Sequence, residues 1–213
     1  MNDEMKVKDR CLIVGAAGFY AERVGDVSDA YIIAVDGGYK SLIDHDIIPD
    51  AVIGDFDSLG YTPARCSNII RLPVKKDDTD SFYAAKHALW QGYRKFYLCG
   101  CAGGKRPEHT FANISLMLYL SRHGATSVIM EGMGEMYSVV SAPCKLEFSG
   151  ERGNFSVFAL SERVSALTLR GFEYETEKIT LCSDIPLGVS NSFKDDICTL
   201  EAEKGDMLLI WEK

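Results

Sequence analysis

Short apolar runs alternate with helix-length segments through the first 130 residues of the chain, and no other feature of the sequence restricts its fold as strongly. Two longer segments, Thr79–Gln91 and His109–Arg122, carry apolar residues at helical spacing. Strands separated by helices form a mostly parallel sheet flanked by helices, so we predict an α/β fold for this half. The predicted strands are Arg10–Gly15, Tyr31–Val35, Ala51–Gly54, Ile69–Leu72, Lys95–Gly100 and Ser127–Glu131.

The pattern changes near Gly132–Ser138, where short strands begin to alternate with glycine-containing and charged turns. Short strands without intervening helices are typical of antiparallel sheets, and we predict a C-terminal β-sandwich. At about 150 residues per domain, a 213-residue chain lies between one domain and two. The change of pattern favours two domains, residues 1–135 and 136–213. The expected strands of the second are Lys145–Phe148, Asn154–Leu160, Ala166–Leu169, Ile179–Cys182, Ile197–Glu201 and Met207–Trp211.

Charge, hydropathy and cysteine usage argue against several classes of function. The chain has 23 Lys and Arg against 31 Asp and Glu, and its formal charge of -8 disfavours nonspecific binding to nucleic acid or to an anionic membrane. No segment has the roughly 20 apolar residues that a transmembrane helix needs. The seven cysteines form no CxxC pair, so we expect a cytoplasmic protein with reduced thiols.

Two aspartates, Asp55 and Asp57, directly follow the predicted strand Ala51–Gly54. The carboxyl ends of strands form the ligand-binding edge of an α/β sheet. In an extended chain both carboxylates would lie on one side and Phe56 on the other. Paired carboxylates repel unless a cation lies between them, which suggests Mg²⁺ and a phosphate-bearing ligand. An Asp-rich turn closed by Ser58 would explain the same residues without a metal.

A second group of acidic residues, Lys75-Lys76-Asp77-Asp78-Thr79-Asp80, precedes the helix predicted to begin near Thr79. One Asp or Thr must cap this helix, but a cap cannot occupy three carboxylates. The helix N-terminus and the two lysines favour a phosphate, while the aspartates suit a metal. Asp36-Gly37-Gly38 follows another strand, although a tight strand-to-helix turn would also account for its glycines. All three loops share one edge of the sheet if the strands are parallel.

Glycines and basic residues follow the strand Lys95–Gly100, in the segment from Gly100 to His109. Glycines let a backbone approach phosphate closely, and Lys105 and Arg106 could neutralise its charge. The segment matches neither a Walker A motif nor GxGxxG, and a simple loop is the alternative. Near the C-terminus, the polar segment Gly188-Val189-Ser190-Asn191 lies between two predicted strands, where a hairpin turn explains it equally well.

The order of these motifs resembles the thiamine pyrophosphokinase family from about Cys11 to the C-terminus: DGG, GDFDS, KDDTD, a glycine loop followed by basic residues, His and AN, then TLRGFEY and GVSN. The resemblance implies an α/β domain that binds ATP and Mg²⁺, and a β-sandwich domain for thiamine binding and dimerisation. It further implies a homodimer with the site at the subunit interface. The implied reaction transfers the pyrophosphoryl group of ATP to thiamine and yields AMP and thiamine diphosphate.

Residue by residue, the resemblance assigns Asp55, Asp57 and Asp80 to the metal and phosphate site, with Asp77 as a supporting carboxylate. Ser190 and Asn191 match the motif that meets thiamine. The residues implied on the nucleotide side are Asp36, Gly37, Gly103, Gly104, Lys105, Arg106, His109 and Asn113.

Two departures from the family pattern leave roles open. The chain has one extra residue before His109 and Glu108 in place of Asp, so either Lys105 or Arg106 could be the cation that faces phosphate. Trp211 lies in the region of the aromatic that packs on thiamine in some relatives, but a core tryptophan on the last strand is at least as plausible.

In the implied reaction the primary hydroxyl of thiamine attacks the β-phosphorus of ATP, and Asp77 or Asp80 is a candidate to accept its proton. Two other functions use parts of the same pattern. A noncatalytic sensor of nucleotide or thiamine diphosphate would keep the glycine loops but could lose the carboxylates. Another Mg²⁺-dependent phosphoryl or nucleotidyl transferase would share the acidic edge without the GVSN segment.

Overall fold

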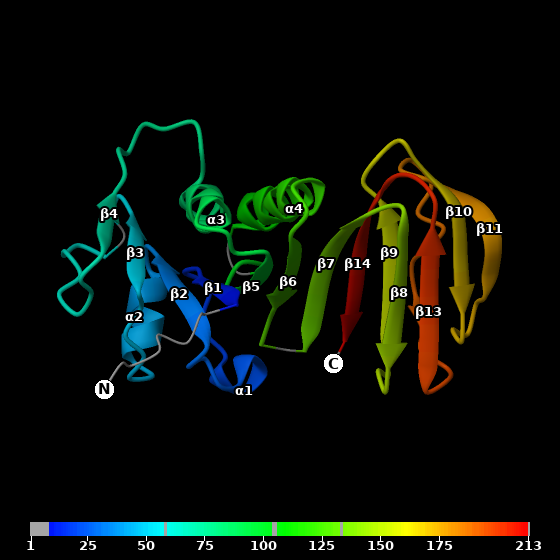
Figure 1. Ribbon diagram of the computed structural model, residues 1–213, viewed down its shortest axis with the longest axis horizontal. Helices are drawn as coiled ribbons and strands as arrows, with labels where there is room; N and C mark the ends of the chain where they lie inside the picture. Colours follow the sequence, from blue (N-terminus) through cyan, green and yellow to red (C-terminus); the bar gives the residue numbers. More distant parts are fainter. Residues whose placement is uncertain (1–8, 58, 104–105, 133, 213) are drawn as a thin grey trace. The chain divides into compact units, whose positions relative to one another are not determined.

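The computed structural model describes residues 9–57, 59–103, 106–132 and 134–212, and it divides into two compact units. Unit 1 comprises residues 1–132 and unit 2 residues 133–213. Figure 1 shows a parallel sheet with helices in unit 1 and antiparallel strands in unit 2. The predicted fold class is therefore confirmed.

The sheet of unit 1 contains six strands in the order β6-β5-β1-β2-β3-β4, and every neighbouring pair is parallel. Each strand is short because it is bounded by the turn residues that the sequence shows. The strands are β1 (Arg10–Val14), β2 (Ala30–Val35), β3 (Ala51–Gly54), β4 (Ile69–Arg71), β5 (Lys95–Cys99) and β6 (Thr126–Met130). The described helices are α1 (Ala21–Val24), α2 (Gly38–Ile43), α3 (Asp80–Trp90) and α4 (Pro107–Arg122).

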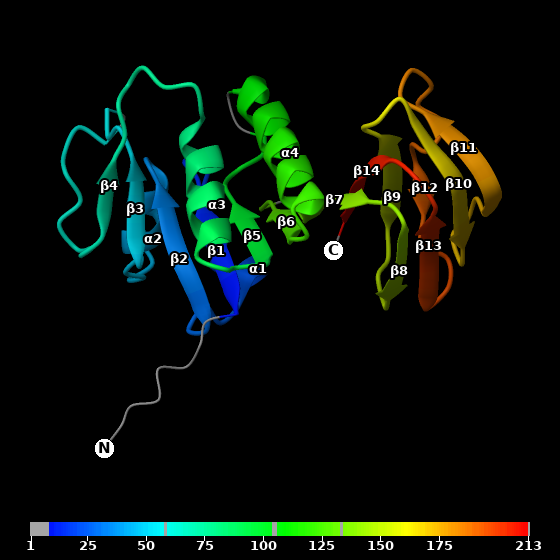
Figure 2. The ribbon, with the colours of Figure 1, turned by 45° about the horizontal axis from the view of Figure 1, so that its top comes forward.

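Helices cover both faces of this sheet, which explains why its strands are continuously apolar. Leu12 and Val14 of β1 share one buried cluster with Leu42 of α2. The alternate residue of β1, Ile13, is equally buried and points to the other face. Figure 2 shows α3 and α4 side by side in front of the strands. No helix in the described part of the chain is long and apolar enough to span a membrane.

The strand order reverses at β1, which lies between β2 and β5. Ligands of open α/β sheets bind at such a switch point, outside the carboxyl ends of the strands. Two loops meet there, because the N–H of Gly15 donates to Cys99 O (2.8 Å) and that of Ala17 to Gly100 O (3.1 Å). Gly100 has φ +64°, and a Cβ on it would lie 2.2 Å from Gly18 O. Only glycine permits this approach of the two loops.

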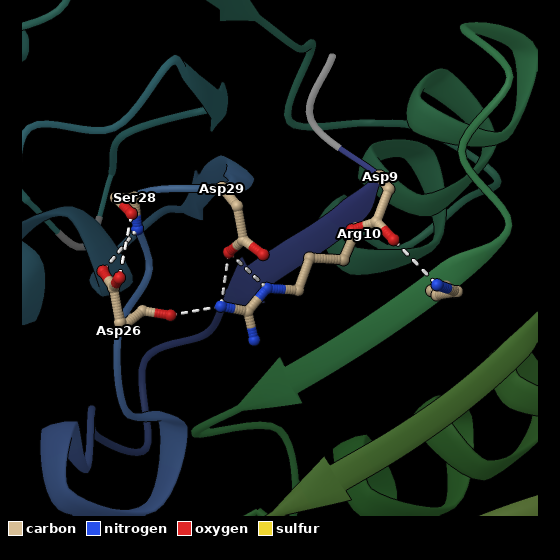
Figure 3. A network of polar contacts seen from close by, with 6 residues as sticks. Asp9, Arg10, Asp26, Ser28 and Asp29 are labelled. Carbon is tan, nitrogen blue, oxygen red and sulfur yellow. Dashed lines mark hydrogen bonds and ion pairs between the residues drawn. The ribbon is translucent and has the colours of Figure 1, made fainter. Parts of the chain in front are cut away.

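The amino ends of β1 and β2, at the opposite edge, are joined by a polar network (Figure 3). Arg10 donates from Nε to Asp29 Oδ1 (2.8 Å) and from its terminal nitrogen to Asp26 O. The Asp26 carboxylate accepts from the N–H and the hydroxyl of Ser28, both at 2.9 Å. Two of the many aspartates in this half therefore have structural partners away from the carboxyl edge.

Unit 2 contains two antiparallel four-stranded sheets, ordered β12-β9-β14-β7 and β11-β10-β13-β8. Their strands are β7 (Glu135–Ser141), β8 (Cys144–Ser149), β9 (Asn154–Ala159), β10 (Arg163–Arg170), β11 (Thr176–Cys182), β12 (Asn191–Ser192), β13 (Ile197–Ala202) and β14 (Asp206–Glu212).

Aromatic side chains from both sheets form the core of this sandwich. Phe148 of β8 lies with its ring centroid 5.5 Å from Phe155 of β9 and 5.9 Å from Trp211 of β14. Phe172 and Phe193 join the same cluster. Trp211 is 9% exposed, so its position agrees with the core interpretation of this residue.

Candidate active site

The loop after β2 holds Asp36 in a conformation that needs a glycine nearby. Asp36 has φ +43°, which is uncommon for a residue with a side chain. Its N–H donates to Ile53 O (3.1 Å), which brings the loop against β3. A Cβ on Gly54 would lie 1.8 Å from Asp36 Oδ1. Gly54 therefore makes room for the Asp36 carboxyl at the end of β3, and such backbone strain is typical of functional sites.

The chain between Asp55 and Asp57 is not extended, contrary to the expected alternation. Phe56 has φ +65°, and its side chain is buried. The N–H of Asp57 donates to Asp55 Oδ1 (3.2 Å), so a local turn replaces the extended chain. Asp55 is half-buried, whereas Asp57 is exposed. The two carboxylates thus have different surroundings.

Lys76 brings Asp55 and Asp80 together. Its Nζ lies 3.2 Å from Asp55 Oδ2 and 2.7 Å from Asp80 Oδ1. The side chains of these residues are 16%, 12% and 16% exposed, respectively. Thr79, one of the candidate caps, accepts from the N–H of Phe82 and caps α3. This leaves Asp80, the first residue of the helix, available to meet Lys76. Sequence reasoning placed Lys76 near phosphate and did not foresee its contact with the carboxylates.

Asp36 belongs to the same acidic site, which we define as Asp36, Asp55, Asp80 and Lys76. Burial, and then the charge of Asp80, raises the pKa of Asp36 to about 6 despite the N–H of Phe56. The pKa of Asp55 is lowered, chiefly by the N–H of Asp57 and then by Lys76. Burial lowers the pKa of the Lys76 ammonium, but its contacts with Asp80 and Asp55 outweigh burial and raise this pKa above its usual value. Asp36 thus interacts with Asp55 and Asp80, the two carboxylates that share the Lys76 ammonium.

No group of three or more His, Cys, Asp or Glu within the described ranges is arranged to hold a metal ion. The donor atoms nevertheless suit one. A magnesium ion that binds with a nucleotide takes one or two protein carboxylates, and phosphate and water complete its shell. Asp55 and Asp80 already share one cation, the Lys76 ammonium. Of the other predicted carboxylates, Asp57 and Asp77 are exposed, and their roles stay predictions.

The glycine loop after β5 is held from inside the fold. The buried Glu131 accepts, at Oε1, the N–H groups of Cys101 (3.1 Å) and Ala102 (2.8 Å). The buried Asn113 of α4 donates from Nδ2 to Cys101 O (2.6 Å). Two successive N–H groups of the loop, those of Cys101 and Ala102, are thus bound to a carboxylate. Only the tertiary contact identifies Glu131, because a single Glu after an apolar strand carries no local signal.

The remaining nucleotide-side candidates lie farther along this loop and at its edge. Gly103 is exposed and has φ +66°. Arg106 and His109 are also exposed, and Arg106 pairs with Glu108 at 2.8 Å. Gly104 and Lys105 lie outside the described residues. Gly37 lies beside Ala16 at the start of α2, with 3.1 Å between the Ala16 Cβ and the position of an added Cβ.

In unit 2, Ser190 and Asn191 occupy different environments. Ser190 is exposed with φ +61°, and its N–H donates to Ser156 Oγ (3.1 Å). Asn191 is buried, and its amide both donates to Tyr174 O and accepts from Tyr174 N, each at 2.9 Å. Asn191 thereby holds the loop that carries the exposed Tyr174 ring. Asn113 and Asn191 thus both have backbone-holding contacts, and a contact of either with ligand stays a prediction.

The chain is similar to known proteins over the elements that carry the acidic site. A family model described as "Thiamin pyrophosphokinase, catalytic domain" matches residues 27–130, which include the acidic site. A curated thiamine pyrophosphokinase from Bacillus subtilis is 26% identical over 183 residues, 84% of this chain and 85% of that protein. Residues 27–130 of this chain therefore match the thiamin pyrophosphokinase family.

Solved structures of the thiamin pyrophosphokinase family share the fold. The B. subtilis thiamine pyrophosphokinase superposes with a TM-score of 0.81 at 24% identity, covering 96% of this chain and 99% of that chain. The thiamin pyrophosphokinase from Candida albicans gives 0.75 at 15% identity, covering 96% and 90%. The chain thus shares its fold with these two structures although most side chains differ.

Proposed function

We propose that this chain transfers the pyrophosphoryl group of ATP to the hydroxyl of thiamine and releases AMP and thiamine diphosphate. The observation that carries the proposal is the shared cation between Asp55 and Asp80 at the carboxyl edge of the unit 1 sheet. The match of residues 27–130 to the thiamin pyrophosphokinase catalytic domain and the similarity to the B. subtilis thiamine pyrophosphokinase support the same reaction.

Asp55 and Asp80 would hold Mg²⁺, and Asp57 would lie close enough in sequence to support it. When bound, the ion would neutralise the phosphate chain and polarise the bond to the leaving phosphate. The fixed turn at Phe56 and the cap at Thr79 orient the two carboxylates before ATP arrives. A site that is already oriented loses less entropy on binding.

Other residues of unit 1 would orient the nucleotide. Glu131 and Asn113 hold the start of the glycine loop in place, so its exposed part, including Gly103, can approach the phosphates. Arg106 is a candidate to neutralise phosphate charge after it separates from Glu108. Asp77 remains the candidate to accept the hydroxyl proton of thiamine, because Asp55 and Asp80 are engaged with a cation.

We place thiamine against the Ser190 loop of unit 2, contributed by a second copy of the chain. Exposed apolar side chains on two loops of this unit support a homodimer, since such residues mark interaction surfaces. They are Tyr174, Ile185, Leu187 and Val189. The seven free cysteines support a cytoplasmic setting. Light scattering in solution would measure the number of copies directly.

Chromatography of the adenine nucleotides tests the reaction. The chain is incubated with ATP and Mg²⁺, with and without thiamine, and AMP, ADP and thiamine diphosphate are quantified. We expect AMP and thiamine diphosphate in equal amounts, and only when thiamine is present. ADP in place of AMP would identify an ordinary kinase. Binding of nucleotide without turnover would identify a sensor, and either outcome would refute the proposal.

A further inference from the structure

Lys76 is a component of the acidic site that the proposed reaction does not use. Its ammonium contacts Asp55 Oδ2 at 3.2 Å and Asp80 Oδ1 at 2.7 Å. These carboxylates come from different elements, the loop after β3 and the first residue of α3. A buried or half-buried ammonium loses hydration, and here two carboxylates compensate for that loss.

The two oxygens that bind Lys76 are also the natural ligands for a divalent cation at this place. The Lys76 ammonium lies 2.7 to 3.2 Å from these two oxygens. A metal ion bound to the same oxygens would therefore lie in direct contact with the ammonium. Like charges at such a distance repel strongly, most of all where water is partly excluded. The four-carbon stem of lysine is flexible, so the ammonium can leave without a change of backbone.

We propose that Lys76 is an internal cation that competes with the divalent metal for Asp55 and Asp80, so that the metal enters this site only as Lys76 leaves it. The proposal rests on the assignment of the metal to these carboxylates. A consequence follows for the order of binding. Free metal binds weakly because it displaces the Lys76 ammonium and leaves it without a partner. A metal–nucleotide complex binds more tightly, because its phosphate oxygens can accept hydrogen bonds from the displaced ammonium. Lys76 thereby couples metal loading to the presence of nucleotide.

Direct titration of Mn²⁺ tests this competition without any measurement of turnover. Free Mn²⁺ is followed by electron paramagnetic resonance with nucleotide-free protein, for the wild type and Lys76→Met. The matched control is Lys75→Met, which removes the same charge from the neighbouring exposed residue. We expect Lys76→Met to bind Mn²⁺ at least about tenfold more tightly than the wild type. We expect Lys75→Met to stay within about twofold, because screening weakens exposed charges.

A nonhydrolysable ATP analogue provides the second arm of the test. With the analogue bound, the advantage of Lys76→Met should shrink or reverse, because the lysine then neutralises phosphate in the wild type. Unchanged or weaker Mn²⁺ binding in nucleotide-free Lys76→Met would overturn the proposal, as would an equal gain in Lys75→Met. If circular dichroism shows that Lys76→Met is unfolded, Lys76→Gln, which keeps hydrogen-bond donors, replaces it with the same expectations.

The two proposals can fail separately. Tighter Mn²⁺ binding in the variant together with no formation of AMP would retain the competition and refute the pyrophosphokinase reaction. Formation of AMP by the wild type together with unchanged Mn²⁺ binding in the variant would do the reverse.

Discussion

Replacement of Glu131 by alanine is expected to destabilise unit 1 and to loosen the glycine loop. In the wild type, Glu131 Oε1 accepts the buried N–H groups of Cys101 and Ala102 at 3.1 and 2.8 Å. The variant leaves both donors without this partner, and each buried unsatisfied group costs about 1–3 kcal/mol. We therefore expect the free energy of unfolding to fall by about 2–6 kcal/mol. The upper end applies if water cannot reach the two N–H groups.

Urea denaturation can assign this loss to one unit. Circular dichroism of helices reports unit 1, because all the described helices lie there. Fluorescence of the buried Trp211 reports the core of unit 2 once the exposed Trp90 of α3, the other tryptophan of the chain, is replaced by phenylalanine in every protein compared. We expect the helical transition of Glu131→Ala to move to lower urea. The Michaelis constant for ATP should rise as well, since the loop would no longer be held in one position.

Glu108→Ala is the matched control, because it removes a carboxylate from the first turn of α4, directly after the same loop. Glu108 is exposed and pairs with the exposed Arg106, and such surface pairs contribute little. We expect its free energy of unfolding to stay within about 0.5 kcal/mol of the wild type. Glu131 would not hold the loop if the free energy of unfolding of Glu131→Ala stayed within about 0.5 kcal/mol of the wild type and its Michaelis constant for ATP were unchanged.

Three further substitutions test the acidic site and its surroundings. Asp80→Asn should lower AMP formation at least about a hundredfold. The control is Asp78→Asn, which removes a carboxylate that pairs with a lysine of α3 and should leave AMP formation close to that of the wild type. Equal losses in the two variants would exclude a specific role for Asp80. Asp36→Asn should gain stability relative to the wild type as pH rises through about 6. The pKa of Asp36 is raised from 3.8 in the unfolded chain to about 6 in the folded protein, so its contribution to the stability of the wild type is complete below pH 3.8 and is lost as pH increases. Urea denaturation at pH 4 and pH 8 measures the difference in stability between the two proteins, and a pH-independent difference would contradict the prediction. Gly38→Ala should cost about 3 kcal/mol or more, since its Cβ would lie 1.9 Å from Val14 O. Gly37→Ala, whose Cβ would lie 3.1 Å from the Ala16 Cβ, needs only a small shift and should cost less than about 1 kcal/mol. Thermal denaturation compares the two variants, and equal stabilities would refute the steric argument.

Local patterns predicted the elements well because the signals are local. Helical spacing from Thr79 and a cap at that residue account for α3, which begins at Asp80. Apolar runs between turn residues account for β1, β2 and β3 at nearly the expected bounds. The short helices α1 and α2 were not predicted, since four to six residues are too few to show a helical period.

The sequence by itself determined that aspartates follow the strands of a parallel sheet, and it supported the resemblance that the family comparison confirms. Only the tertiary structure decided which of them meet. Strand order brings Asp36 beside the end of β3, whereas Asp26 and Asp29 lie at the opposite edge with Arg10. Likewise, Lys76 and Glu131 acquire their partners at separations of 21 and about 30 residues. Such contacts depend on how distant segments pack, and electrostatic attraction acts through space without regard to position in the chain.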